Sequence, residues 1–260
     1  MTDINFDTIK FRASSWGSLM ADPQSKEDKL AGELGLTAKK ELMRIYNKEM
    51  YDWDEDDITT PAMEKGTLVQ TDSIIMYSKI EGKFYEENNT QLENDWAKGM
   101  PDVFLGKDIY HAEQVDDMKN SYLLSNFSDH TVESATKDQK CQLNVYYALT
   151  GASGGNIVHA LMALPTKMFE KEKDKLLWRM SNAGEIATEY APEYMEAVEK
   201  LKKKFIYDHI PEEERIFKIP VERDDELIEK MQERVPKLRN WLKKYHESRM
   251  NYKKASKYLI

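Results

Sequence analysis

The chain has 260 residues, 40% of them hydrophobic and 33% charged, and its formal net charge is −9. This length and apolar content exclude a disordered chain and indicate a folded protein with one substantial core or two small ones. The acidic balance excludes a protein that coats nucleic acid through bulk charge alone. The single cysteine, Cys141, excludes an internal disulfide framework and an all-cysteine metal centre. With no membrane-length apolar run and no secretory leader in the sequence, we expect a cytoplasmic protein.

The first half of the chain predicts helices followed by strands. Apolar residues recur near helical spacing over residues 26–50, and Thr37 is the expected N-cap of a second helix within this stretch. Residues 62–80 also show a helical pattern, in spite of Gly66. The segments 83–106 and 108–120 predict strands joined by tight turns at 88–89 and 106–107.

The second half alternates helix and strand. Residues 137–151 predict a helix that ends at Gly151, and the apolar run 155–165 predicts a buried strand. A long charged helical region follows at about 166–204, then a strand at 214–224 and a terminal helix at about 224–257 that opens at Asp224. Helices flanking a small mixed sheet indicate an α/β or α+β fold. No internal repeat or flexible linker divides it, so we expect one domain over 1–260 with a charged helical insertion at about 166–215.

Two short motifs on neighbouring strands carry candidate chemistry. Pro101-Asp102 is the only Pro-Asp pair of the chain, and Asp117 stands two residues before Lys119. Alternate side chains of a strand share a face, so Asp117 and Lys119 point one way while Asp116 and Met118 point the other. Asp116 is then predicted to be a surface charge. This local pattern is compatible with a solvated hairpin or with a divalent-metal site that cleaves phosphodiesters.

The order of the surrounding elements favours the metal site. Upstream lies the predicted helix with Gly66 and Gln70, and downstream lies a helix on which Gln142 and Tyr146, four residues apart, share a face. This succession resembles the PD-(D/E)xK nuclease superfamily, in particular its lambda-exonuclease, YqaJ and RecB-nuclease branch. The segments 11–20 ("FRASSWGSLM") and 221–242 are similar to the opening and closing parts of phage recombination exonucleases, so the resemblance covers most of the chain.

The resemblance implies a role for each motif residue. Asp102, Asp117 and the backbone carbonyl of Met118 would hold Mg²⁺, for which Mn²⁺ would substitute, and Lys119 would act on the attacking water. A lysine beside a metal is expected to have a lowered pKa, which would suit proton transfer. Gln70 stands where the family most often has glutamate, so it would be a neutral ligand at a charge-poor site. The implied DNA contacts are Arg12, Ser14, Gln142 and Tyr146.

The function implied by this resemblance is a metal-dependent DNA exonuclease of the phage-recombination type. It would degrade one strand of linear duplex DNA, 5′ to 3′, in a bacterial or phage-infected cytoplasm, as a ring-shaped trimer working with a single-strand annealing protein. The alternatives are a structure-selective or RecB-like repair endonuclease and a catalytically weak nuclease-fold DNA-binding protein. The basic, aromatic segment 237–257 is compatible with a solvated helix face or with a phosphate-contacting surface.

Overall fold

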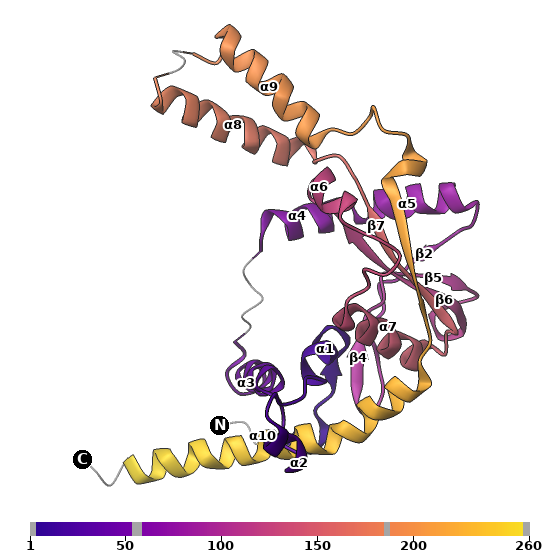
Figure 1. The fold of residues 1–260 in the computed structure, drawn as a ribbon, viewed down its shortest axis with the longest axis vertical. Helices are drawn as coiled ribbons and strands as arrows, with labels where there is room; N and C mark the ends of the chain where they lie inside the picture. The colour runs from indigo at the N-terminus through magenta and orange to yellow at the C-terminus, as the bar shows by residue number, and fades with distance from the viewer. Residues whose placement is uncertain (1–3, 54–58, 185–187, 257–260) are drawn as a thin grey trace.

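A mixed sheet of five strands forms the centre of the molecule in the computed structural model, which describes residues 4–53, 59–184 and 188–256 (Figure 1). The order across the sheet is β2 (Glu86–Glu87), β5 (Val103–Gly106), β6 (Ala112–Asn120), β7 (Gly154–Ala160) and β8 (Ile216–Glu222). Only β6 and β7 run parallel; the other neighbours are antiparallel. The parallel pair needs a long crossover, which α6 (Leu124–Ser128) and α7 (Lys137–Thr150) provide.

A helix covers each face of this sheet. On one face, Leu143 and Tyr147 of α7 pack against Val115 and Ile157 in the largest core cluster. On the other face, α5 (Gln70–Glu81) packs through Ile74 and Tyr77 in a second, smaller cluster. The two faces follow the alternation of β6, since Val115 lies in one cluster and Met118 in the other.

A smaller sheet and the N-terminal helices extend the core of α7. The order of this sheet is β1 (Phe11–Arg12), β4 (Ala97–Gly99) and β3 (Leu92–Glu93). Beside it lie α1 (Trp16–Leu19), α2 (Lys26–Leu30) and α3 (Leu36–Tyr51). The terminal helix α10 (Asp225–Ser256) crosses this region and buries Met231, Leu238 and Leu242 in the same cluster.

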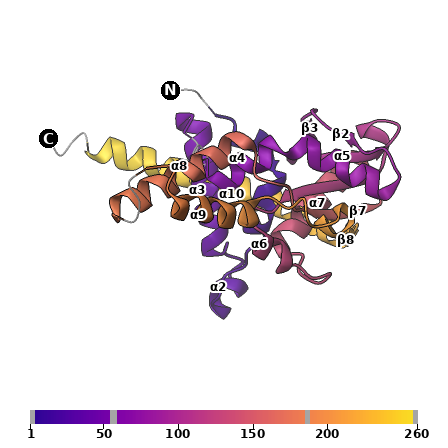
Figure 2. The ribbon, with the colours of Figure 1, turned by 90° about the horizontal axis from the view of Figure 1, so that it is seen from above.

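The other helices lie beyond the far end of the sheet. The short α4 (Pro61–Leu68) precedes α5. The helices α8 (Thr166–Asn182) and α9 (Pro192–Phe205) form a hairpin that projects from the body in Figure 1, and Figure 2 shows the same two helices side by side from above. No helix of the described ranges is long and apolar enough to cross a membrane.

Local signals in the sequence account for several element ends. Thr136 and Gln139 form a capping box at the start of α7, and Gly151 ends that helix with φ of 84°, where a glycine is least strained. The side chain of Asp224 accepts a hydrogen bond from the Leu227 amide at 2.9 Å, so Asp224 caps α10 as predicted.

Two predicted helices are interrupted. The stretch 26–50 divides into α2 and α3, and the N-cap of α3 is Gly35 rather than Thr37, because the chain turns at residues 31–35. The stretch 62–80 divides at Val69, whose ψ of 5° departs from helical geometry. The predicted strand segment 83–106 contains four short strands, since its polar turns limit each to a few residues.

Candidate active site

Two carboxylates meet where β5 and β6 pair. Val103 stands opposite Asp116 in the antiparallel register, so Asp102, just before β5, lies beside Asp117. The Met118 amide donates a 2.8 Å hydrogen bond to Asp102 Oδ2. Asp117 is 2% exposed, and Asp102 is half-buried beside it.

Lys119 and the α7 side chains complete this constellation. The Lys119 ammonium lies 2.6 Å from Asp117 Oδ2, and the Gln142 amide donates to Asp117 Oδ1 at 3.1 Å. The same Gln142 nitrogen donates to the Tyr146 hydroxyl oxygen at 2.8 Å. The structure therefore brings together Asp102, Asp117, Lys119, Gln142 and Tyr146, which the sequence placed on three separate elements.

The electrostatics of the two acids reflect their crowding. Burial and the neighbouring Asp117 charge raise the pKa of Asp102 to about 7. Burial by itself lowers the pKa of Lys119, but the Asp117 and Asp102 carboxylates outweigh it and hold the pKa above its ordinary value. The expected lowering of the Lys119 pKa concerns a lysine beside a bound metal ion, so it stays a prediction.

The pair of carboxylates fits a divalent cation. A cation would remove the repulsion that raises the pKa of Asp102, and hard Mg²⁺ needs only one or two carboxylates because it keeps several waters. Within the described residues, no group of three or more His, Cys, Asp or Glu side chains forms a metal-ligand cluster. The Met118 carbonyl is a neutral oxygen that could join the two carboxylates.

Gln70 reaches this site from the start of α5. Its amide nitrogen lies 3.5 Å from Asp102 Oδ1, a long donor–acceptor contact. In this orientation the amide shields the Asp102 charge, and its oxygen would face a metal only after the amide turned over. Gln70 therefore lies beside Asp102, and its role as a neutral metal ligand stays a prediction.

The prediction that Asp116 is a surface charge is wrong. Its side chain does face away from Asp117, but it is fully buried rather than a surface charge. Tyr77 donates to it at 2.9 Å, Gln114 at 2.8 Å and the Asn156 amide at 2.6 Å. Burial raises its pKa above the ordinary value, although these hydrogen bonds oppose the shift. The prediction failed because alternation identifies the face of a strand but not the helix, here α5, that covers it.

Arg12, Ser14 and Tyr146 line a single open cavity of about 470 Å³. Lys98, the register partner of Arg12 between β1 and β4, lines it too. Gly99 permits this arrangement, because a Cβ there would lie 2.7 Å from Tyr146 Cε1. Tyr146 accepts a hydrogen bond from Gln142, and Gln142 also donates to Asp117. The cavity that holds Arg12 and Ser14 is therefore connected through Tyr146 and Gln142 to the Asp117 carboxylate.

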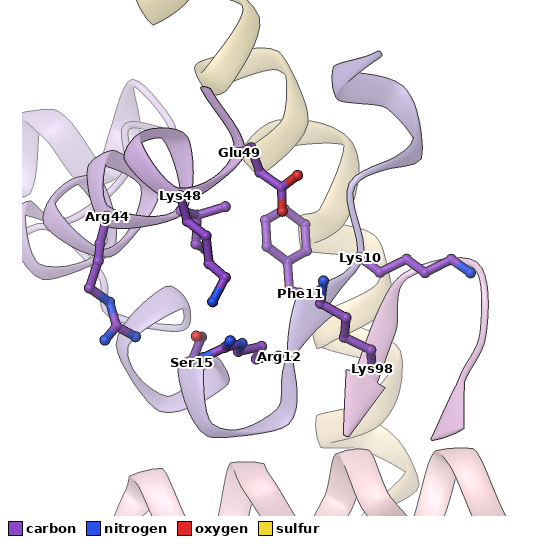
Figure 3. Close-up of a pocket in the computed structure, with 9 residues that line it drawn as sticks. Lys10, Phe11, Arg12, Ser15, Arg44, Lys48, Glu49 and Lys98 are labelled. Carbon is purple, nitrogen blue, oxygen red and sulfur yellow. The ribbon is translucent and has the colours of Figure 1, made fainter. Parts of the chain in front are cut away.

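A second, basic pocket adjoins the first across Arg12 (Figure 3). In this pocket of about 30 Å³, the side chains of Arg44, Lys48 and Lys98 point toward the space beside Arg12 and Ser15. Sequence analysis missed Arg44, Lys48 and Lys98. The four-residue spacing of Arg44 and Lys48 on one helix was an available signal, but Lys98 joins them only through the β1–β4 pairing.

Two histidines lie beyond Lys119 on the same sheet face. His159 is the register partner of Lys119 on β7, and its ring stacks on that of His130 with centroids 3.4 Å apart. Burial and the nearby His130 and Lys119 charges lower the pKa of His159 to about 4, so it is neutral at ordinary pH. His159 therefore flanks the candidate site without adding charge to it.

Comparison with solved structures shows that the chain shares its fold with two proteins whose structures are known. A phage-related exonuclease from Haemophilus somnus 129PT matches with a TM-score of 0.66 at 20% identity, over 93% of this chain and 96% of that one. An alkaline exonuclease from Laribacter hongkongensis matches with a TM-score of 0.59 at 14% identity, over 96% of this chain and 95% of that one. No protein-family model and no curated protein matches the chain. The predicted fold class, a small mixed sheet flanked by helices, is confirmed.

Proposed function

We propose that this protein is a metal-dependent deoxyribonuclease that degrades one strand of linear duplex DNA from its end. The observation that carries this proposal is the constellation of Asp102, Asp117 and Lys119, tied through Gln142 to Tyr146 and so to a basic cavity. The shared fold with phage-related and alkaline exonucleases supports it.

The proposed site would hold Mg²⁺, or Mn²⁺ in its place, through Asp102, Asp117 and the Met118 carbonyl, with Gln70 as a neutral neighbour. When bound, the ion would neutralise charge on the scissile phosphate and make water a better nucleophile. Gln142 keeps one Asp117 oxygen fixed. The Lys119 ammonium, 2.6 Å from the other oxygen, would orient the water and stabilise charge that develops on the phosphate.

The proposed DNA path runs from this site past Tyr146 to Arg12 and Ser14. Arg12 and Lys98 would contact phosphate, since both line the cavity that Tyr146 shares. Arg44 and Lys48 would extend the contact into the adjoining pocket. These basic groups are local, so DNA binding is compatible with a net charge of −9.

The resemblance supports finer proposals on polarity and partners. Digestion would run 5′ to 3′ and leave a single strand for an annealing protein, in a bacterial or phage-infected cytoplasm. The protein would work as a ring-shaped homotrimer around DNA, in which only the inner lining need be basic.

One gel experiment tests the activity. End-labelled linear duplex and closed circular duplex are incubated with the protein, with and without Mg²⁺, beside an Asp117→Asn control. We expect Mg²⁺-dependent loss of the linear form alone, absent in the control. Cleavage of both forms would indicate an endonuclease, and cleavage of neither a DNA-binding protein with this fold. Labelling either the 5′ or the 3′ end gives the polarity.

A further inference from the structure

Lys119 and a bound cation would share one carboxylate. Both Asp117 oxygens already have partners, since Gln142 donates to Oδ1 at 3.1 Å and the Lys119 ammonium lies 2.6 Å from Oδ2. A divalent cation on Asp117, as the proposed function requires, would bring a second positive charge beside that ammonium. Like charges a few ångströms apart repel strongly where water is largely excluded. Lys119 therefore needs another partner when the cation is bound.

His159 stands beside Lys119 on the neighbouring strand. The two residues are register partners between β6 and β7, and alternation puts both on the face that Val115 and Ile157 share with α7. Neighbouring strands lie about 4.8 Å apart, a gap that the long stem of a lysine spans. His159 is 5% exposed, and its Nε2 is a buried nitrogen without a hydrogen-bond partner among the described residues. A donor that reached this nitrogen would recover the free energy that its isolation costs.

The surroundings of His159 favour Lys119 as that donor. Two other neighbours in the sheet, Phe217 on β8 and Ile157 on the same strand, are apolar. The His130 ring covers one face of the imidazole, with centroids 3.4 Å apart and planes 23° apart, and this stacking leaves the nitrogens at the ring edge free. Burial, with smaller contributions from His130 and Lys119, lowers the pKa of His159 to about 4. The ring is therefore neutral at ordinary pH and has a lone pair that can accept a hydrogen bond.

We propose that His159 is a positioning residue for Lys119. With a cation on the carboxylates, the Lys119 ammonium turns from Asp117 to the unprotonated Nε2 of His159 and donates a hydrogen bond to it. This bond keeps the ammonium beside the site, where it faces the attacking water and the phosphate, instead of releasing it to solvent. His130 holds the plane of the imidazole. The inference rests on the proposed function and deepens it, since Lys119 has one partner in the metal-free protein and another in the loaded protein.

NMR of the ring nitrogens tests this exchange of partners without DNA. The protein is prepared with isotopically labelled histidine, and the His159 resonances are identified by their loss in His159→Phe. Calorimetry establishes that Mg²⁺ is bound. We expect Mg²⁺ to move the Nε2 resonance of the wild type upfield, because the lone pair then accepts a hydrogen bond, and to leave it unchanged in Lys119→Met.

Four results of this experiment would overturn the proposal. They are an unchanged Nε2 resonance in Mg²⁺-bound wild type, a protonated Nε2 in that state, and a shift that persists in Lys119→Met. The fourth is a Lys119→Met protein that binds no Mg²⁺, because Lys119 would then belong to the metal site itself.

Cleavage rates separate a positioning role from a structural one. His159→Phe keeps a ring to stack on His130 but has no nitrogen, so kcat should fall at least about tenfold while KM for DNA and Mg²⁺ binding stay as in the wild type. Its thermal unfolding midpoint should be no lower, since the change removes a buried nitrogen without a partner. His159→Gln, whose amide oxygen can accept in place of Nε2, should recover part of the rate. His209→Phe makes the same change at an exposed histidine and should behave as the wild type.

The outcomes distinguish failure of this inference from failure of the proposed function. A wild type that cleaves DNA with Mg²⁺, together with an unchanged kcat in His159→Phe, would keep the proposed function and overturn the role of His159. A lower unfolding midpoint in His159→Phe with no recovery in His159→Gln would make the residue structural and overturn it too. A protein that shows the Mg²⁺-dependent shift but cleaves no DNA would overturn the proposed function and support the exchange of partners. A wild type that binds no Mg²⁺ would overturn both.

Discussion

Asp117 is the residue on which the candidate chemistry depends most, since its two oxygens contact Lys119 and Gln142. Asp117→Asn should reduce cleavage at least about 10²-fold, because it removes a charged ligand from a site with only two carboxylates. The fold should persist, since the change also relieves the repulsion on Asp102. Initial rates on end-labelled duplex and the thermal unfolding midpoint measure both effects. Activity within about tenfold of the wild type would contradict the assignment.

Asp116 should affect stability rather than chemistry. Asp116→Asn places an amide donor among the donor groups of Tyr77, Gln114 and Asn156. The free energy of unfolding should fall by about 1–3 kcal/mol, as expected when a buried polar group loses its partners. Urea denaturation measures it, with Tyr77→Phe as a milder change that removes one donor. An unchanged midpoint would show that these hydrogen bonds contribute nothing net.

Lys119 is assigned to the water and the phosphate rather than to the metal. Lys119→Met should therefore lose turnover and still bind Mg²⁺ or Mn²⁺. Binding should not weaken, because the substitution removes a cation 2.6 Å from an Asp117 oxygen. Isothermal calorimetry in the absence of DNA tests this directly. A variant that no longer binds either ion would make Lys119 part of the metal site.

At the scale of elements, Gln70 at the start of α5 places a neutral amide beside Asp102, where a glutamate would add a negative charge. Gln70→Glu would add a third carboxylate beside Asp102, and two nearby cations repel each other less when more carboxylates surround them. We expect tighter binding of a second ion and activity at lower Mg²⁺ concentration. The exposed change Gln232→Glu on α10 adds the same charge elsewhere and should have no effect. Superimposable Mg²⁺ titrations for Gln70→Glu and wild type would remove Gln70 from the site.

At the scale of the whole molecule, Lys65 joins three separate parts. It is fully buried on α4, and its ammonium donates to the Ser121 and Tyr122 carbonyls at 2.7 and 3.1 Å. Its charge also lies 5.7 Å from the ring of Tyr207, which follows α9. Burial lowers the pKa of Lys65 from 10.5 to about 8. The folded protein therefore bears the cost of a buried charge below about pH 8.

The pH dependence of Lys65→Met follows from this shift. Between about pH 8 and 10.5 the unfolded chain binds more protons at Lys65 than the folded chain, so the stability contributed by this residue falls as pH is lowered through that window. Relative to Lys65→Met, the wild type should gain up to about 3 kcal/mol on going from pH 7.5 to 10. Urea denaturation of both proteins at several pH values measures it. A pH-independent difference would contradict the assigned shift.

The sequence by itself determined the elements whose signals are local. The capping residues of α7, the start of α10 at Asp224 and the buried strand β7 follow from neighbouring residues. Strand alternation correctly placed Asp117 and Lys119 on one face and Asp116 on the other. The order of the predicted helices and strands led to the correct fold class, a mixed sheet flanked by helices, because that order is a property of the sequence alone.

Only the tertiary structure decided which surfaces are covered and which distant residues meet. Periodicity reports the direction of a side chain but not the element that packs over it, so Asp116 was misplaced and the burial of Lys65 was missed. Arg12, Lys98 and Tyr146 line one cavity because β1 pairs with β4 and because Gly99 allows Tyr146 to pack closely against β4. The helical pattern of residues 166–204 was visible in the sequence, but the projection of the α8–α9 hairpin from the body appears only in the tertiary structure.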